Sequence, residues 1–550
     1  MRNAFNRVIA YIDSVLARDF LTKEEKDILR YAKNILVNGA SMAIGDNFAT
    51  KLLFLIPLLL SKLNSDKDHM AAYGLTTTMI SLLLILTFSP LYFHGFSAGA
   101  HFENFDESNE DQREQKRKAI ALVIRNGLVY SVPMTMLSAL PFIFSRAIFT
   151  DWFGQSERVA EIAESFLRPF ALSIPGIFSA FLLTAPLIAA GRTRVFLVSP
   201  VILAFCLFLS GALAFGRYRL PELGLTGALM GCILEPYLDA LYKFYSLFLS
   251  AHFRKYELLR VVKENFRRDL SGVLKLVING SAISAQVAED YSVPFFLLLL
   301  SHKLGETAQA ACAIAFLFQS ICALFNIFCA VAGSIAVGGE INNVEKVFSE
   351  APKAIAVKIP LVISASAGAV LPILFSVQPG IAMLITHNDD RSVKEQLESI
   401  APYVALAAWL NAIAFQLAFL SRAWYLPRNQ DHPLSAYDKY WKAVGLRLIG
   451  NGLGFGIGVF ATFFWSLGIQ GIGLSCLLAE VFSIIALAKY CYGGTVQQLQ
   501  RAYHPEIAAS ASQNAGNEEE RPLLEVAPTP TNYQEPETEN PEEQGRFCCC

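Results

Sequence analysis

Two adjacent carboxylic acids, Glu289 and Asp290, lie among small and apolar residues in the stretch 279–304, NGSAISAQVAEDYSVPFFLLLLSHKL. This stretch is long enough for a membrane-spanning helix. A charge at the centre of such a helix costs about 3 kcal/mol on insertion scales, so it usually faces a bundle interior or a watery cavity. We therefore predict a proton- or ion-coupling site at Glu289. Asp290 is a weaker candidate, because it points about 100° away around the helix.

A carboxylate in a low-dielectric cavity can hold either a proton or a cationic solute, and the two compete for it. The alternative is a structural pair of Glu289 with Lys51 or a nearby hydroxyl. Lys51 lies deep in an apolar run and follows Asp46 closely. Asp46 is a second coupling candidate, or else a capped acid at the start of its helix. Lys51 would act as a fixed charge or extend its amine to the membrane surface.

Other polar side chains interrupt apolar stretches. Glu235, Asp239 and Lys243 follow one another at one-turn spacing, so they share a helix face and either neutralise one another or line a pore. Apart from Lys51, we expect no cluster of deep Arg or Lys residues. The remaining candidates for a polar cavity are Asn411, Gln416 and Glu480.

The composition is that of a membrane protein. Of 550 residues, 54% are apolar and 17% charged, and the mean hydropathy is +0.41. The net charge of −2 gives no basic bias towards nucleic acid. The apolar runs are too long for barrel strands, which leaves helices to satisfy the backbone in lipid. No cysteine spacing indicates a zinc site or disulfides, and we expect no cofactor.

Apolar stretches of about 20 residues predict spanning helices. Basic residues are concentrated in the connections around 101–118, 191–194, 252–271 and 421–442, all on one side of a twelve-helix arrangement. By the positive-inside rule that side is cytosolic, and so are both termini. We predict an all-α polytopic membrane protein whose twelve transmembrane helices are 40–61, 71–98, 119–144, 166–190, 195–216, 224–251, 272–301, 307–338, 355–385, 401–424, 441–465 and 470–491.

The chain contains an internal repeat. NGASMAIGDNFATKLLFLIPLLLSKL, from Asn38, aligns with the stretch from Asn279, and LGLTGALMGCILE, from Leu223, aligns with LGIQGIGLSCLLAE, from Leu467. The offset is roughly 240 residues in both cases. Two pseudo-symmetric six-helix lobes with a substrate site between them are an arrangement typical of transporters. The predicted regions are a cytosolic amphipathic segment (1–38), an N-terminal lobe (39–251), a basic cytosolic linker (252–271), a C-terminal lobe (272–495) and a disordered acidic cytosolic tail (496–550).

The sequence resembles the multidrug and toxin extrusion (MATE) family of the flippase-like exporter superfamily. The resemblance rests on HMAAYGL, LIAAGRTRVFLVSPVI, ELGLTGALMG and KLGETAQAACAIAFLFQS, and it covers most of 35–495. It implies a two-lobed, V-shaped exporter that couples solute exit to inward H+ or Na+ movement. It also implies a coupling role for Glu289, about twenty residues before the alanine pair. Bacterial members have an acid near the place of Leu58, where this chain has none.

We therefore predict a secondary active antiporter, and not an enzyme, that exports small organic solutes, cationic or amphipathic, in exchange for H+ or Na+. We expect a monomer that contacts membrane lipid. A flippase for lipids or lipid-linked sugars would use the same scaffold but needs basic residues for phosphate. A membrane-embedded enzyme would need clustered His, Asp or Ser, and the eight histidines are scattered singly. No P-loop indicates an ATP-driven pump.

The tail after about 510 is acidic and Pro-rich, so we expect disorder. Glu519 with Leu523 and Leu524 matches the acidic dileucine signal read by clathrin adaptors. The terminal cysteines suggest S-acylation, although they do not form a prenylation box. These signals fit a eukaryotic endomembrane (endosome, lysosome or vacuole), and a bacterial effector delivered into host cells could borrow them. The three cysteines are Cys548, Cys549 and Cys550.

Overall fold

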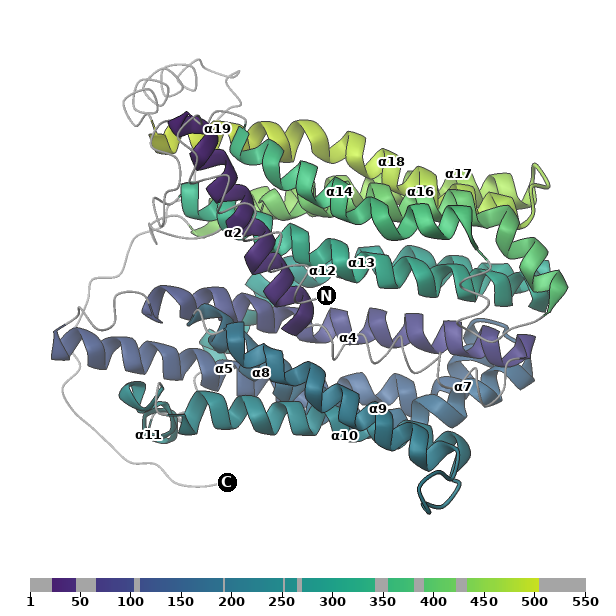
Figure 1. Cartoon of the computed structure of the whole chain (residues 1–550), viewed down its shortest axis with the longest axis horizontal. Coiled ribbons are helices and arrows are strands. Elements are labelled where there is room, and N and C mark those ends of the chain that lie inside the picture. Colours follow the sequence, from purple (N-terminus) through teal and green to yellow (C-terminus); the bar gives the residue numbers. More distant parts are fainter. Residues whose placement is uncertain are drawn as a thin grey trace, which may run out of the picture. The chain divides into compact units, whose positions relative to one another are not determined.

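The protein is seen in a computed structural model that describes residues 22–45, 66–102, 109–190, 193–250, 253–264, 270–341, 355–379, 390–421 and 433–503. All regular elements in these ranges are helices (Figure 1). Eleven of the twelve predicted spans correspond to helices or helix pairs, with ends that differ by up to about ten residues. The first span, 40–61, falls largely outside the described residues.

The first half contributes α2 (Lys23–Gly45), α4 (Lys67–Phe102), α5 (Glu110–Ile143), α7 (Glu157–Phe170), α8 (Ile174–Ala189), α9 (Ser199–Ala214) and α10 (Gly224–Phe244). The second half contributes α12 (Leu270–Ser301), α13 (Glu306–Ile341), α14 (Ile355–Val377), α16 (Arg391–Leu420), α17 (Pro433–Phe463), α18 (Ile469–Leu487) and α19 (Gly493–Tyr503). Eight segments of the described chain are long and apolar enough to span a membrane.

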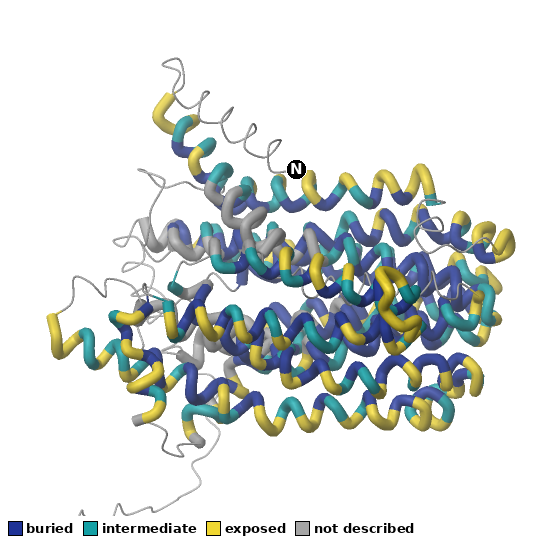
Figure 2. Tube along the Cα trace, turned by 60° about the horizontal axis from the view of Figure 1, so that its bottom comes forward, coloured by how far each residue is buried: buried dark blue, intermediate teal, exposed yellow. Residues whose placement is uncertain are grey.

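The helix surfaces are suited to a lipid membrane. In Figure 2 the buried residues follow the faces that helices turn to one another, while exposed residues lie along outer faces and at helix ends. The outer face of α5 is apolar, with Val132 56% and Met136 69% exposed. Such surfaces are stable in lipid, because the hydrocarbon is as apolar as the side chains.

The two halves repeat one another. The helices α4 and α13 both contain 36 residues, and α13 begins 239 positions after α4. In each half the first helix packs against the second helix of the other half: α2 contacts α13, and α12 contacts α4. The order of helices is that expected from two pseudo-symmetric six-helix lobes.

Small residues allow α4 and α13 to cross closely. Gly74 lies so near Ala313 that a Cβ added to the glycine would be 2.3 Å from the alanine Cβ. Ala71 and Ala72 on α4, and Ala310 on α13, are fully buried in the same core. These residues belong to the HMAAYGL and GETAQAACAI motifs, so the motifs encode the contact between the halves.

The helix α12 lies against both halves. A Cβ on Gly280 would meet the Pro90 backbone of α4 at 2.4 Å, and one on Gly272 would meet Asn126 of α5 at 2.3 Å. Further along, α12 also contacts α17 and α18 of its own half. A side chain on the middle of α12 is therefore placed where the two halves meet.

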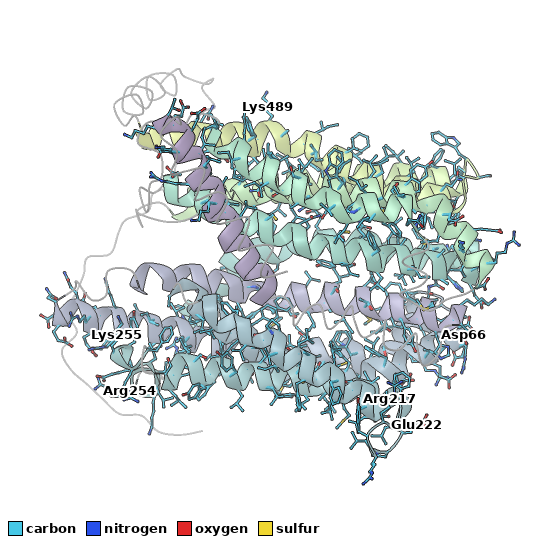
Figure 3. All side chains as sticks on the ribbon, viewed as in Figure 1. Asp66, Arg217, Glu222, Arg254, Lys255 and Lys489 are labelled. Carbon is cyan, nitrogen blue, oxygen red and sulfur yellow. The ribbon has the colours of Figure 1, made fainter. Side chains whose placement is uncertain are left out.

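Polar contacts join the halves at the end marked by Asp66 in Figure 3. Lys67, at the start of α4, forms an ion pair of 2.8 Å with Glu306, at the start of α13. Gln309 donates a hydrogen bond of 2.6 Å to Gln155, which precedes α7. Arg254 and Lys255, from the predicted cytosolic linker, lie at the opposite helix ends in the same view.

The predicted linker and the start of the predicted tail both contain helices. The linker 252–271 includes α11 (Leu258–Glu264), and Phe253 and Tyr256 before it are buried against α5 and its neighbours. The helix α19 continues to Tyr503, so folded structure extends past residue 495, where we placed the start of the disordered tail. Its Thr495 and Leu499 are buried, which ties this last helix to the core.

Candidate functional site

Glu289 is buried in a polar network of three helices. Its Oε1 accepts a hydrogen bond of 2.8 Å from Asn451 Nδ2 on α17. The Asn451 Oδ1 accepts one of 2.6 Å from Ser483 Oγ on α18. Glu289 itself is only 4% exposed. The carboxylate predicted from the sequence thus faces the second half and not lipid.

A second acid, Glu480, lies on α18 one turn before Ser483. Its Oε1 accepts a hydrogen bond of 2.8 Å from Asn411 Nδ2 on α16. Both residues are buried. Three-residue spacing puts Glu480 and Ser483 on one face of α18. Since Ser483 bonds to Asn451, the partner of Glu289, the carboxylates of Glu289 and Glu480 belong to the same group of helices.

Arg447, on α17, is the cation of this group. This side chain is fully buried, and its guanidinium carbon is 4.9 Å from the ring centre of Phe415 on α16. It interacts electrostatically with both Glu289 and Glu480. On α17 it is one turn before Asn451, which places the cation and the amide on the same face. We call Glu289, Asn411, Arg447, Asn451, Glu480 and Ser483 the C-half cluster.

The charges of the C-half cluster do not cancel when both carboxylates are ionised, because two acids share one guanidinium. Glu289 Oε2 and Glu480 Oε2 are buried and make no hydrogen bond to a described residue. A buried charge without a counter-charge is costly. The arrangement can therefore take up one proton, or one monovalent cation, at little electrostatic cost.

A second buried cluster lies in the first half. Lys243 Nζ is 2.7 Å from Asp239 Oδ2 and donates a hydrogen bond of 2.7 Å to Thr184 Oγ1 on α8. Ser199 Oγ, at the start of α9, donates one of 2.6 Å to Asp239 Oδ1. Glu235 lies one turn before Asp239 and is 1% exposed. We call these five residues the N-half cluster.

The structure brings together only part of the predicted site. Glu289, Glu480 and Asn411 share the C-half cluster, whereas Glu235 belongs to the other half. Gln416 accepts a hydrogen bond of 2.8 Å from Ser364 on α14, away from Glu480. The side chain of Asp290 is not described. The positions outside the described residues are Asp46, Lys51, Glu519, Leu523, Leu524, Cys548, Cys549 and Cys550.

Sequence analysis overlooked Arg447, Asn451 and Ser483. Arg447 interrupts the predicted span 441–465, so the argument applied to Glu289 would have selected it. Arg447 and Lys243 are both buried, but they lie singly in different halves and form no cluster. Asparagine and serine are common in helices, so no sequence signal marked the other two. In the described part of the chain, no group of three or more His, Cys, Asp and Glu residues could hold a metal ion.

Known structures with a similar fold are membrane transporters. The eukaryotic MATE transporter AtDTX14 matches with a TM-score of 0.69 and 15% identity, over 87% of this chain and 99% of that one. An inward-facing multidrug resistance MATE transporter of the MOP superfamily matches with 0.63 and 14% identity, over 86% and 99%. A MOP superfamily transporter from Pyrococcus furiosus, titled for the reverse polarity of its binding pocket, matches with 0.63 and 15% identity, over 86% and 97%.

No protein-family model and no curated protein matches the sequence. The similarity to solved structures is accordingly one of fold, extended over nearly their whole length. It agrees with the short motifs that carried the resemblance in the sequence, and with the all-helical described chain. The chain therefore has the fold of the multidrug and toxin extrusion transporters.

Proposed function

We propose that the protein is a secondary active transporter that exchanges a small organic cation for protons, with the C-half cluster as its coupling site. The observation that carries the proposal is the surplus acid: among the described residues, Glu289 and Glu480 share one buried cation, Arg447. Such a site is electrically balanced when it holds one proton or one positive charge. Intramembrane acids of this kind commonly serve proton relays or ion pathways.

The donors around the acids favour H+ over Na+ as the coupling ion. A hard metal cation needs several oxygen ligands. Here the amide nitrogens of Asn451 and Asn411 point at the carboxylates and occupy one oxygen of each acid. The guanidinium of Arg447 supplies a further positive charge. This arrangement favours a proton, which needs one oxygen, over a metal ion, which needs several.

Competition at Glu289 would couple the two fluxes. When the carboxylate is ionised it attracts a cationic solute, and when a proton binds the attraction is lost. The helix α12 contacts α4 in one half and α17 in the other, so a change at Glu289 acts on both. Alternating access then moves the two halves against each other around this site.

The direction of transport follows from the charge of the helix ends. Arg254 and Lys255 mark the basic end, which the positive-inside rule assigns to the cytosol. Protons from an acidic lumen would enter at the opposite end, where Lys67 and Glu306 join the halves. In an endosomal or lysosomal membrane the protein would thus load organic cations into the organelle.

The buried cations do not favour a lipid flippase. Such a protein needs basic residues gathered for a phosphate group. Arg447 and Lys243 lie in different halves, and each already faces carboxylates within its own cluster. A phosphate would have to displace these acids from their partners.

The test is uptake of a fluorescent organic cation into proteoliposomes, driven by a pH gradient. Wild type should transport, and Glu289→Gln should fold normally but lose gradient-driven uptake. Glu161→Gln is the matched control, because Glu161 is exposed on α7 and pairs with the exposed Arg158. Full activity of Glu289→Gln would reject the coupling role of this acid. Uptake driven by Na+ alone would reject proton coupling.

A further inference from the structure

The N-half cluster contains an ion pair whose members are already satisfied. Lys243 contacts Asp239 and Thr184 at 2.7 Å each, and its Nζ is 5.4 Å from the ring centre of Phe196. The other carboxylate oxygen of Asp239 accepts a hydrogen bond from the hydroxyl of Ser199. One ammonium and one carboxylate cancel, so this pair makes no demand for a further charge.

Glu235 remains after this pairing. It is 1% exposed, and its Oε1 finds no hydrogen-bond partner in the described part of the chain. A carboxylate buried in this way is costly while it is charged, unless a proton or another cation accompanies it. Glu235 therefore presents an unsatisfied oxygen in the interior of the first half.

Among the described residues, the elements packed against Glu235 supply no second buried cation. Asp239 and Lys243 lie on the same helix, and the two thiols that interact with it are Cys206 on α9 and Cys232 on α10. The helix α8, which packs against α10, contains no ionisable residue between Ile174 and Ala189. The ionisable side chains of α7 are exposed or half-buried.

The other half has a residue of the same type next to the repeat-related place. When Leu223 is aligned with Leu467, Glu235 falls opposite Ala479, and Glu480 follows one position later. Each cluster has two carboxylates and one cation, Lys243 or Arg447. Each half therefore has one surplus acid.

We propose that Glu235 is a second proton-binding site, in the N-terminal half, whose ligand is one proton. The inference rests on the proposed antiport and extends it from one coupling site to one in each half. On protonation Glu235 becomes a neutral carboxylic acid whose O–H can donate a hydrogen bond. On deprotonation the proton leaves to water, and a negative charge remains beside the Asp239–Lys243 pair. A full cycle then moves two protons for each solute.

Two measurements test this proposal separately from transport itself. Infrared difference spectra of the purified protein, recorded while the pH is changed, report carboxylic acids that gain or lose a proton. Wild type should show a buried carboxyl band that is absent in Glu235→Gln and displaced in Glu235→Asp. Glu222→Gln, at an exposed position in the preceding turn, is the matched control and should leave the band unchanged. A spectrum of Glu235→Gln identical to wild type would overturn the proposal, whether or not the protein transports.

The second measurement is the proton-to-solute ratio in proteoliposomes, obtained from the pH gradient that just halts net solute flux. The ratio should fall from two in wild type to one in Glu235→Gln, with uptake retained. An unchanged ratio in Glu235→Gln would overturn the role in coupling. If the wild-type protein showed no uptake, the proposed antiport would be rejected. The infrared result would still decide whether Glu235 binds a proton.

Discussion

Replacing Arg447 by methionine should be one of the most damaging single changes in the second half. Methionine retains the length and apolar contact of the side chain but removes the guanidinium. Glu289 and Glu480 would then both lie in the protein interior without the guanidinium that acts on them electrostatically. Removing the cation beside a buried acid should cost up to about 3–5 kcal/mol, the range for breaking a buried ion pair, because an uncompensated charge stays behind. The lost stacking on Phe415 adds about 0.5–2 kcal/mol.

The same reasoning predicts a rescue. In the double variant Arg447→Met/Glu480→Gln only one acid remains, and that acid can be neutral by holding a proton. Most of the lost stability should therefore return. Lowering the pH should also reduce the deficit of the single variant, because protonation removes the negative charge.

The measurement is the loss of folded protein on heating in detergent, followed by size-exclusion chromatography at two pH values. The control is Arg168→Met on α7, whose side chain is 67% exposed and pairs with Glu164 at 3.5 Å. Exposed pairs contribute about 1 kcal/mol or less. The explanation is wrong if Arg447→Met is no less stable than Arg168→Met at neutral pH, or if removing Glu480 brings no recovery.

Three further predictions concern the contact between the halves and its rim. Gly74→Ala should cost about 1–3 kcal/mol of stability by overpacking, because the new Cβ would be 2.3 Å from a Cβ of α13. The control Gly211→Ala has open space around it and should cost nothing. Thermal unfolding of the two variants compares them. Lys67→Glu should slow transport by placing two acids together, and the exchanged pair Lys67→Glu/Glu306→Lys should restore the rate; a double variant as slow as the single one would contradict this. Partial burial raises the pKa of Asp66, but hydrogen bonds with His69 outweigh this effect and hold the pKa below its ordinary value. This contact therefore stabilises the fold above about pH 4 and is lost as the pH falls further, so Asp66→Asn should be less stable than wild type near neutrality and equal to it in acid.

The spans and their order could be predicted because lipid imposes one rule on every segment. Backbone groups must be satisfied within a helix of sufficient length, so apolar length alone locates most of the helices. The internal repeat then predicted two similar halves, and α4 and α13 have the same length. The predicted tail began too early, because α19 buries Thr495 and Leu499 without the long apolar run that marks a span.

The functional site could be predicted only as separate acids. The sequence by itself predicted Glu289, Glu235 and Glu480 as acids within apolar helices, since each interrupts an apolar run and charges in lipid are rare. Which acids share a site depends on helix rotation and on which helices are neighbours, and hydropathy records neither. Packing of α12 against α17 and α18 alone decided that Glu289 meets Asn451, and that Arg447 serves both Glu289 and Glu480. The physical reason is that apolar length fixes where a chain crosses lipid, while close contact between small residues fixes how the crossings face one another.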